Sequence, residues 1–151
     1  AQEFGWKLID DNNRQTLFME MVEQMDMSYS YKPVLLKAVL QYADKQGRVK
    51  IEDIVSHFKA YYEDRRAKGV KVEKQNSIFA KGGYTDKEAE RNILSNPFKR
   101  FEDMNMMRHT KTLGIVEVEP TVWKKLSESD IANIINICDD MLEKYYLRIS
   151  K

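Results

Sequence analysis

Few residues of this chain have the types and spacing that catalysis requires. Glu117 and Glu119 flank Val118 in an alternating segment, so both carboxylates would lie on one face of a predicted strand. Paired carboxylates are what a metal-dependent nuclease uses to hold a divalent cation beside a phosphate, but no lysine follows at the spacing such enzymes use. A solvent-exposed strand face explains the pair more simply. We therefore expect no catalytic residue in this chain, and no metal or other cofactor.

The other nucleophiles and metal ligands are isolated. His57 and His109 are far apart in the sequence, and neither has a Cys or a second His at helical spacing, which argues against a metal site. Cys138 is the single cysteine, so an internal disulfide is excluded. It falls within an apolar helical stripe, which predicts a small core residue. The chain also lacks the Gly-rich phosphate-binding loop of nucleotide hydrolases.

Basic residues offer a better-supported chemistry, the binding of phosphate groups. Residues 57–113 carry 13 Lys/Arg and 8 Asp/Glu, a net charge of +5, whereas the segments on either side are net negative. Such cations would supply salt-dependent affinity for nucleic acid without choosing a sequence. Each one alone is better explained as a solubilising surface charge, and the set together suggests nucleic-acid contact. The candidate nucleic-acid contacts are Lys99, Arg100, Arg108, His109, Lys111, Arg65, Arg66 and Lys68.

The first elements that would position these cations have an order typical of a winged helix. A helix with Pro33 in its first turn ends at Gly47, which accepts a left-handed conformation cheaply. A short strand at residues 48–50 and an amphipathic helix at residues 51–67 follow. Residues 70–84 then lose this periodicity and predict an inserted loop that carries further charge.

The second half of the pattern supplies a short basic helix and a wing. A capping box at Thr85–Glu88 predicts a helix from Asp86, which Asn96-Pro97 interrupts. Pro97 opens a fresh helix to about Met104, and residues 107–118 alternate as a hairpin. Recognition contacts would come from Lys99 and Arg100 on the short helix and from Arg108, His109 and Lys111 on the wing.

The predicted fold class is mainly α with a small β-hairpin: an elaborated winged-helix-like domain with extra N- and C-terminal helices. The first of these helices is rich in methionine, and the last follows an N-terminal cap at Ser127. We expect residues 1–10 to be a tail or linker end and residues 11–151 to form a single domain. The chain has no apolar run of the length that suggests a membrane span and no signal peptide, so a cytoplasmic location is expected.

Several strings in the chain resemble a known bacterial domain. They are Ser30-Tyr31-Lys32-Pro33-Val34-Leu35-Leu36-Lys37-Ala38, Gly47-Arg48-Val49, the stretch from Phe58 to Tyr62-Glu63-Asp64-Arg65-Arg66, and Asn96-Pro97-Phe98. Together they resemble a domain found C-terminal to the motor of some superfamily II (DEAD/DEAH-type) helicases, often beside a phospholipase D-like nuclease in restriction or defence proteins. The resemblance covers roughly residues 28–148. It implies a DNA-associated accessory role and carries over no catalytic residue.

Three functions follow from these patterns. The first is a non-catalytic accessory domain that binds duplex DNA as part of a larger helicase or restriction-type protein. The second is a protein-docking or oligomerisation module that uses the Met-rich first helix and the last helix. The third is a metal-dependent nuclease domain. The expected partners are DNA, the remainder of a larger polypeptide and a second copy of the chain, with no membrane partner. The absence of an initiator Met favours a piece of a longer protein.

Overall fold

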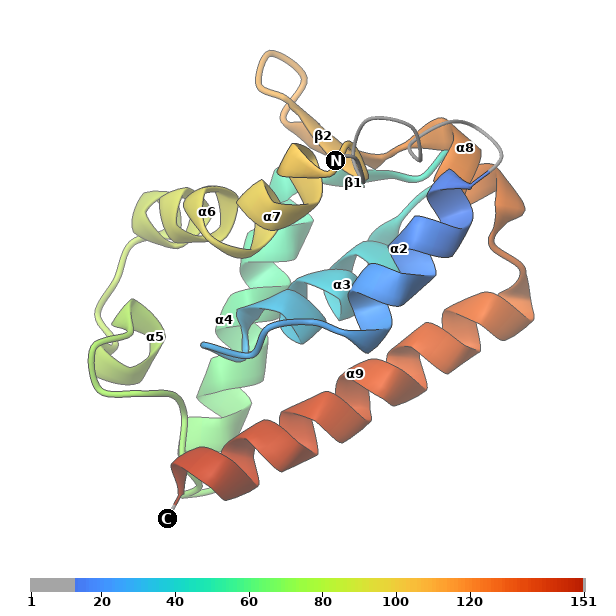
Figure 1. The fold of residues 1–151 in the computed structure, drawn as a ribbon. Coiled ribbons are helices and arrows are strands. Elements are labelled where there is room, and N and C mark those ends of the chain that lie inside the picture. Colours follow the sequence, from blue (N-terminus) through green and yellow to red (C-terminus); the bar gives the residue numbers. More distant parts are fainter. Residues whose placement is uncertain (1–12, 151) are drawn as a thin grey trace.

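The computed structural model of the chain describes residues 13–150, so the predicted tail at residues 1–10 lies outside the described residues. The structure is mainly helical with one small sheet (Figure 1). In chain order its elements are α2 (Arg14–Glu23), α3 (Tyr31–Tyr42), β1 (Arg48–Lys50), α4 (Ile51–Ala67), α5 (Ile78–Lys81), α6 (Asp86–Ser95), α7 (Pro97–Asp103), β2 (Met107–Thr110), β3 (Ile115–Val118), α8 (Pro120–Lys125) and α9 (Glu128–Ile149). No helix within this part of the chain is long and apolar enough to cross a membrane.

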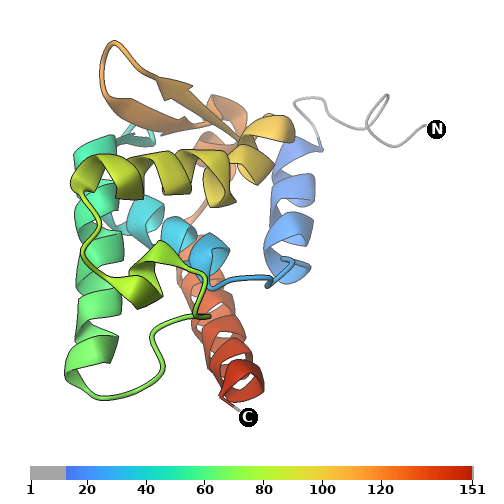
Figure 2. The ribbon, with the colours of Figure 1, turned by 90° about the vertical axis from the view of Figure 1, so that its left-hand side faces the viewer.

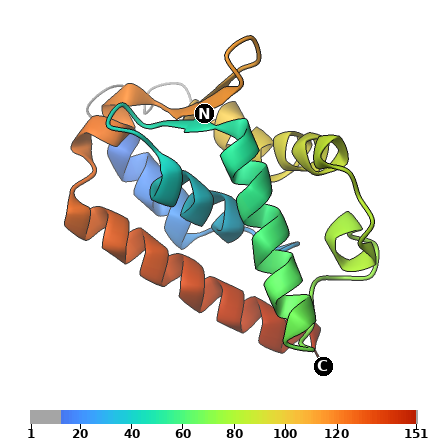
Figure 3. The same ribbon diagram turned by 180° about the vertical axis from the view of Figure 1, so that it is seen from behind.

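Helix α3 is the centre of the hydrophobic core. Apolar side chains surround most of its circumference, and a helix of that kind is stable only in an interior. It packs against α4, α7 and α9, and α9 covers one side of the helical layer (Figure 3). The buried residues of α3 are Tyr31, Pro33, Val34, Leu35, Leu36, Ala38 and Val39.

The sheet has three antiparallel strands in the order β1-β3-β2. Val49 of β1 pairs with Val116 of the central strand, and Met107 of β2 pairs with Val118. All four side chains are buried, so one face of the sheet closes the core. The hairpin of β2 and β3 extends beyond the helices, above α6 and α7 (Figure 2). We call this hairpin, residues 107–118, the wing.

Local sequence signals located several elements correctly. Thr85 and Glu88 form the predicted capping box, and α6 begins at Asp86. Ser127 and Asp130 form a second box at the start of α9, because the Ser127 side chain accepts the Asp130 N–H and the Asp130 carboxylate accepts the Ser127 N–H. Pro97 begins α7, where its missing N–H leaves no hydrogen bond unmade.

The structure extends the predicted pattern at three places. Residues 48–50 pair with β3, so the expected hairpin is part of a three-stranded sheet. A further helix, α8, starts at Pro120 shortly after the predicted hairpin, because the Glu119 side chain accepts the N–H groups of Thr121 and Val122. The insertion contains the single-turn helix α5, which Ser77 caps.

Gly47 lies under the ring of Trp123 and supplies a sharp test of this packing. Its φ is +80°, and a Cβ built on it would lie 2.7 Å from Cγ of Trp123. We expect Gly47→Ala to lower the free energy of unfolding by about 2–3 kcal/mol, from backbone strain and overpacking together. Urea denaturation would measure the change.

Gly69 is the matched control for Gly47. It has a similar φ of +72°, but a Cβ there would meet nothing within 4 Å. Gly69→Ala should therefore cost only the backbone strain, about 1 kcal/mol. Equal losses in the two variants would show that Trp123 moves aside at no cost.

Candidate nucleic-acid interface

A basic groove lies between α6 and the wing. Ala89 and Ile93 of α6 are buried, and this anchors the helix so that its opposite face is directed to solvent. The groove has a volume of about 440 Å³. Its lining is Lys87, Glu90, Arg91, Leu94, Ser95, His109 and Lys111.

The cations of this groove are available to a ligand. Lys87, Arg91 and Lys111 form no ion pair with any other residue in the described part of the chain. His109 packs its ring edge-on against Phe98, with 6.2 Å between the ring centroids, which fixes the side chain beside α7. Exposed cations without an internal partner can contact phosphate without first breaking an ion pair.

The predicted recognition helix α7 is less well suited to contact phosphate than the groove between α6 and the wing. The ammonium group of Lys99 lies 2.7 Å from the Asp103 carboxylate and 3.9 Å from that of Glu102. The hydrogen bond to Asp103 and the negative charge of Asp103 raise the pKa of Lys99. Lys99 therefore stays protonated, but the carboxylates of its own helix offset its positive charge. Arg100 lines a different groove, between α2 and α7, together with Lys32. The structure therefore does not place Arg100 in the groove beside the wing.

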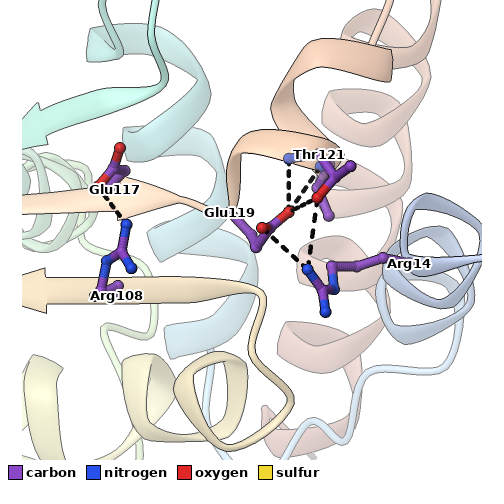
Figure 4. Close-up of polar contacts among 6 residues, drawn as sticks. Arg14, Arg108, Glu117, Glu119 and Thr121 are labelled. Atoms are coloured by element: carbon purple, nitrogen blue, oxygen red, sulfur yellow. Dashed lines mark hydrogen bonds and ion pairs between the residues drawn. The ribbon is translucent and has the colours of Figure 1, made fainter. Parts of the chain in front are cut away.

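At the base of the wing, the predicted pair of carboxylates binds arginines. Glu117 is only 9% exposed, and its two oxygens lie 3.1 Å from Arg108 of β2 and 3.4 Å from Arg48 of β1. Glu119 lies 3.0 Å from Arg14. Figure 4 shows the Glu117–Arg108 and Glu119–Arg14 pairs, and shows that Glu119 also reaches the start of α8. Among residues 13–150, no three or more His, Cys, Asp or Glu side chains are grouped to hold a metal ion.

The titration of Glu119 reflects these contacts. Partial burial would raise its pKa, but hydrogen bonds from Thr121 and Val122 and the charge of Arg14 together lower it. Glu119 is therefore held ionised as a helix cap and ion-pair partner, and Arg108 is held by Glu117 with much of its guanidinium still exposed. These arrangements stabilise the sheet and give neither carboxylate the role of a general base.

The cations at the end of α4 have structural partners. Arg65 donates from Nε to the Lys71 carbonyl at 2.6 Å, and its guanidinium lies 3.4 Å from the centre of the Tyr146 ring. Arg66 donates to the Phe79 carbonyl at 2.7 Å. Lys68 pairs with Asp64 within its own helix. These three residues lie at the end of α4 remote from the wing, so the structure separates them from the other candidates (Figure 3).

The structure also reveals a buried polar cluster that the sequence did not indicate. Glu73, in the insertion, is 2% exposed, and its carboxylate accepts the N–H and O–H of Ser30, the O–H of Tyr145 and the N–H of Lys74. Tyr62 donates to the Ser30 hydroxyl, because that hydroxyl donates its own proton to Glu73. The cluster ties the start of α3 to the insertion and α9. Glu73 lies in an aperiodic stretch, where no local pattern marks a residue as buried.

Burial shifts the pKa of two other candidate reactive groups, Cys138 and His57. Burial raises the pKa of the Cys138 thiol to about 12, so the thiolate that nucleophilic chemistry needs is not formed near neutral pH. Burial and the charge of Lys37 lower the pKa of His57, whose ring packs edge-on against Tyr42. Cys138 is thus the core residue that its helical spacing predicted.

A second groove, of about 480 Å³, lies between α2 and α7. Three methionines contribute much of its apolar lining: Met21 of α2, Met25 just after α2 and Met104 just after α7. The lining is Leu17, Glu20, Met21, Gln24, Met25, Asp26, Lys32, Arg100, Phe101 and Met104. Flexible thioether side chains suit a surface that adapts to a protein partner.

Comparisons with known proteins gave no relative for this arrangement. No family model, no curated protein and no solved structure matches the chain.

Proposed function

We propose that this chain is a winged-helix-like nucleic-acid-binding module without catalytic chemistry of its own. The observation that carries the proposal is the groove between α6 and the wing, where Lys87, Arg91 and Lys111 converge and, among residues 13–150, take part in no ion pair. A duplex backbone carries one negative charge per roughly 1.7 Å of helix axis, so cations spaced along a helix and a hairpin can each meet a phosphate.

The order of elements supports the winged-helix comparison. A helix, a short strand, a second helix, a third helical segment and a two-stranded wing follow one another as α3, β1, α4, α6-α7 and β2-β3. The strand order β1-β3-β2 places the wing beside the helices that precede it. In this comparison the third helical segment is bent at Asn96, and its longer arm, α6, borders the groove.

The role of this module in a larger protein follows from the resemblance of its sequence strings. A nucleic-acid-binding module without a catalytic cluster suits an accessory part of a bacterial helicase or restriction-type protein. Its task there would be to hold duplex DNA while another part of the polypeptide performs the chemistry. Cations in the groove would contact phosphate rather than bases, so we propose binding with little sequence preference.

Salt dependence tests the proposal directly. Binding of the chain to a fluorescein-labelled 20-base-pair duplex, followed by fluorescence anisotropy between 50 and 200 mM NaCl (roughly the range over which such binding is most sensitive), should weaken steeply. Three to four phosphate contacts predict a slope of about −3 in log K against log salt concentration. Undetectable binding at the lowest salt, or a slope near zero, would contradict the proposal.

The methionine-lined groove favours a protein-docking module as the second candidate function. Its position between α2 and α7 leaves it separate from the basic groove, so the two functions are compatible. The occupant we propose for it is the remainder of the parent polypeptide. Light scattering of the isolated chain would show whether a second copy occupies the groove instead.

A further inference from the structure

The wing turn exposes a large apolar side chain. Leu113 is 69% exposed, more than any other large hydrophobic residue in the described part of the chain. It lies in the four-residue connection Lys111-Thr112-Leu113-Gly114, after the last paired residues of the wing, Thr110 and Ile115. The turn therefore extends an apolar tip beside the unpaired charge of Lys111.

The backbone holds this tip in a defined conformation. The N–H of Leu113 donates to the Thr110 carbonyl at 3.2 Å, and the N–H of Gly114 donates to the Lys111 carbonyl at 3.2 Å. Gly114 has φ +64°, which closes the second of these overlapping turns at low cost. Its carbonyl accepts the N–H of Ile51, the first residue of α4, at 2.9 Å. A preorganised tip loses little conformational freedom when it binds.

The chemistry of leucine limits what this tip can recognise in nucleic acid. A leucine side chain cannot hydrogen-bond to phosphates or base edges, so its favourable contact is with the face of a base. The minor groove of B-DNA is about 6 Å wide, while paired strands alone are about 4.8 Å apart before their side chains are added. The wing thus fits poorly inside an intact minor groove, and base faces are accessible where a duplex ends or opens.

We propose that Leu113 packs on the terminal base pair at a junction between duplex and single-stranded DNA. The cations of the α6–wing groove would hold the phosphates of the adjoining duplex. The preferred ligand is then a forked duplex, and the tip acts as a wedge against the first base pair. This inference rests on the proposed function, because it uses the same groove to hold the duplex.

The test compares a forked duplex with a dumbbell of the same stem, whose ends are closed by loops. Anisotropy should show about tenfold tighter binding to the fork, equivalent to about 1.4 kcal/mol. Leu113→Ser should remove this preference and leave binding to the dumbbell unchanged. Leu113→Met keeps an apolar side chain and should retain the preference. A 2-aminopurine placed as the first unpaired base of the fork should brighten on binding the wild-type chain, because Leu113 would displace it from its stack on the terminal base pair. With Leu113→Ser it should stay stacked and dim.

The outcomes separate the wedge from the proposed function. Equal affinity for fork and dumbbell, or a fork preference that survives Leu113→Ser, would overturn the wedge while leaving salt-dependent duplex binding intact. Failure to bind either DNA would overturn both proposals. Leu113 is exposed, so unchanged circular dichroism and thermal unfolding of the serine variant would show that any lost preference comes from the contact rather than from the fold.

Discussion

Glu73→Ala is expected to lower the free energy of unfolding by about 3–4 kcal/mol, the largest loss from any single substitution we propose. The carboxylate accepts four hydrogen bonds in a buried site. Alanine would remove the acceptor of the Ser30 and Lys74 N–H groups and leave the Ser30 and Tyr145 hydroxyls with weaker alternatives, and each unsatisfied buried donor costs about 1–3 kcal/mol. Relaxation and entry of water reduce the sum, so the expected loss is smaller than four independent penalties.

The loss should be global rather than confined to the insertion. Ser30 occupies the N-cap position of α3, the central helix, and Tyr145 belongs to α9, so Glu73 joins two main helices through one side chain. Burial raises the pKa of Tyr145, and its hydrogen bond and proximity to Glu73 raise it further, so the phenol stays protonated and donates at all ordinary pH values. Thermal unfolding followed by both circular dichroism and tyrosine fluorescence should shift by the same amount.

Two further variants sharpen the test of Glu73. Glu73→Gln preserves the size of the side chain but turns an NH₂ group toward donors, so it should lose most of the stability that alanine loses. Glu143→Ala on α9 removes an exposed glutamate and should change stability by less than about 0.5 kcal/mol. If both Glu73 variants lowered the free energy of unfolding by less than about 1 kcal/mol, the hydrogen bonds of the Glu73 cluster would contribute little to stability.

Local patterns predicted more of the fold than of the interface, for a physical reason. The capping boxes at Thr85 and Ser127 and the start of α7 at Pro97 depend on residues three positions apart or fewer. Pairing of β1 with β3 instead joins Arg48 to Glu117, which lies 69 positions further along the chain. A strand of three residues is too short for its sequence to indicate its pairing partner. Such non-local pairing depends on how the helices between them pack.

In the candidate interface, too, local spacing predicts some contacts, while others depend on how distant segments pack. Lys99 and Asp103 are four positions apart on a helix, and this spacing alone indicates an ion pair. The ion pair makes Lys99 a weaker candidate for a phosphate contact. By contrast, Arg65 contacts a ring of α9, and Arg66 donates to carbonyls of the insertion in addition to pairing with Glu63 on its own helix. Only the Glu63 pair has a spacing that the sequence reveals. Lys87 and Arg91 gain their place in the interface only because α6 folds beside the wing.

Reversing the charges of the α6–wing groove is expected to have the largest effect on binding. Lys87→Glu, Arg91→Glu and Lys111→Glu together should weaken duplex binding by about 100-fold or more at 100 mM salt (roughly physiological ionic strength), because each lost phosphate contact is replaced by repulsion. The three side chains take part in no ion pair among the described residues, so the substitutions break none, and circular dichroism of the variant would check that it is folded. Anisotropy with the same labelled duplex measures the change.

A matched triple variant separates a local interface from net charge. Lys68→Glu, Lys71→Glu and Lys144→Glu change the net charge by the same −6 (three changes of −2 each), but they lie on α4, the insertion and α9, away from the wing. Loss of long-range attraction alone should weaken binding only a few-fold at this salt concentration, since the Debye length is about 10 Å. Equal losses from the two triples would show that the chain attracts DNA through its overall charge and has no interface in the groove.

The double variant Lys99→Glu with Arg100→Glu tests whether α7 rather than α6 contacts the DNA, by the same measurement of lost duplex affinity. Lys99 already pairs with Asp103, and Arg100 borders the methionine-lined groove, so we expect a loss well below that of the α6–wing triple. A larger loss would move the interface to α7. It would also mean that DNA approaches across the α7 face, and the methionine-lined groove beside Arg100 would then be partly covered by the nucleic acid instead of being free for a protein partner.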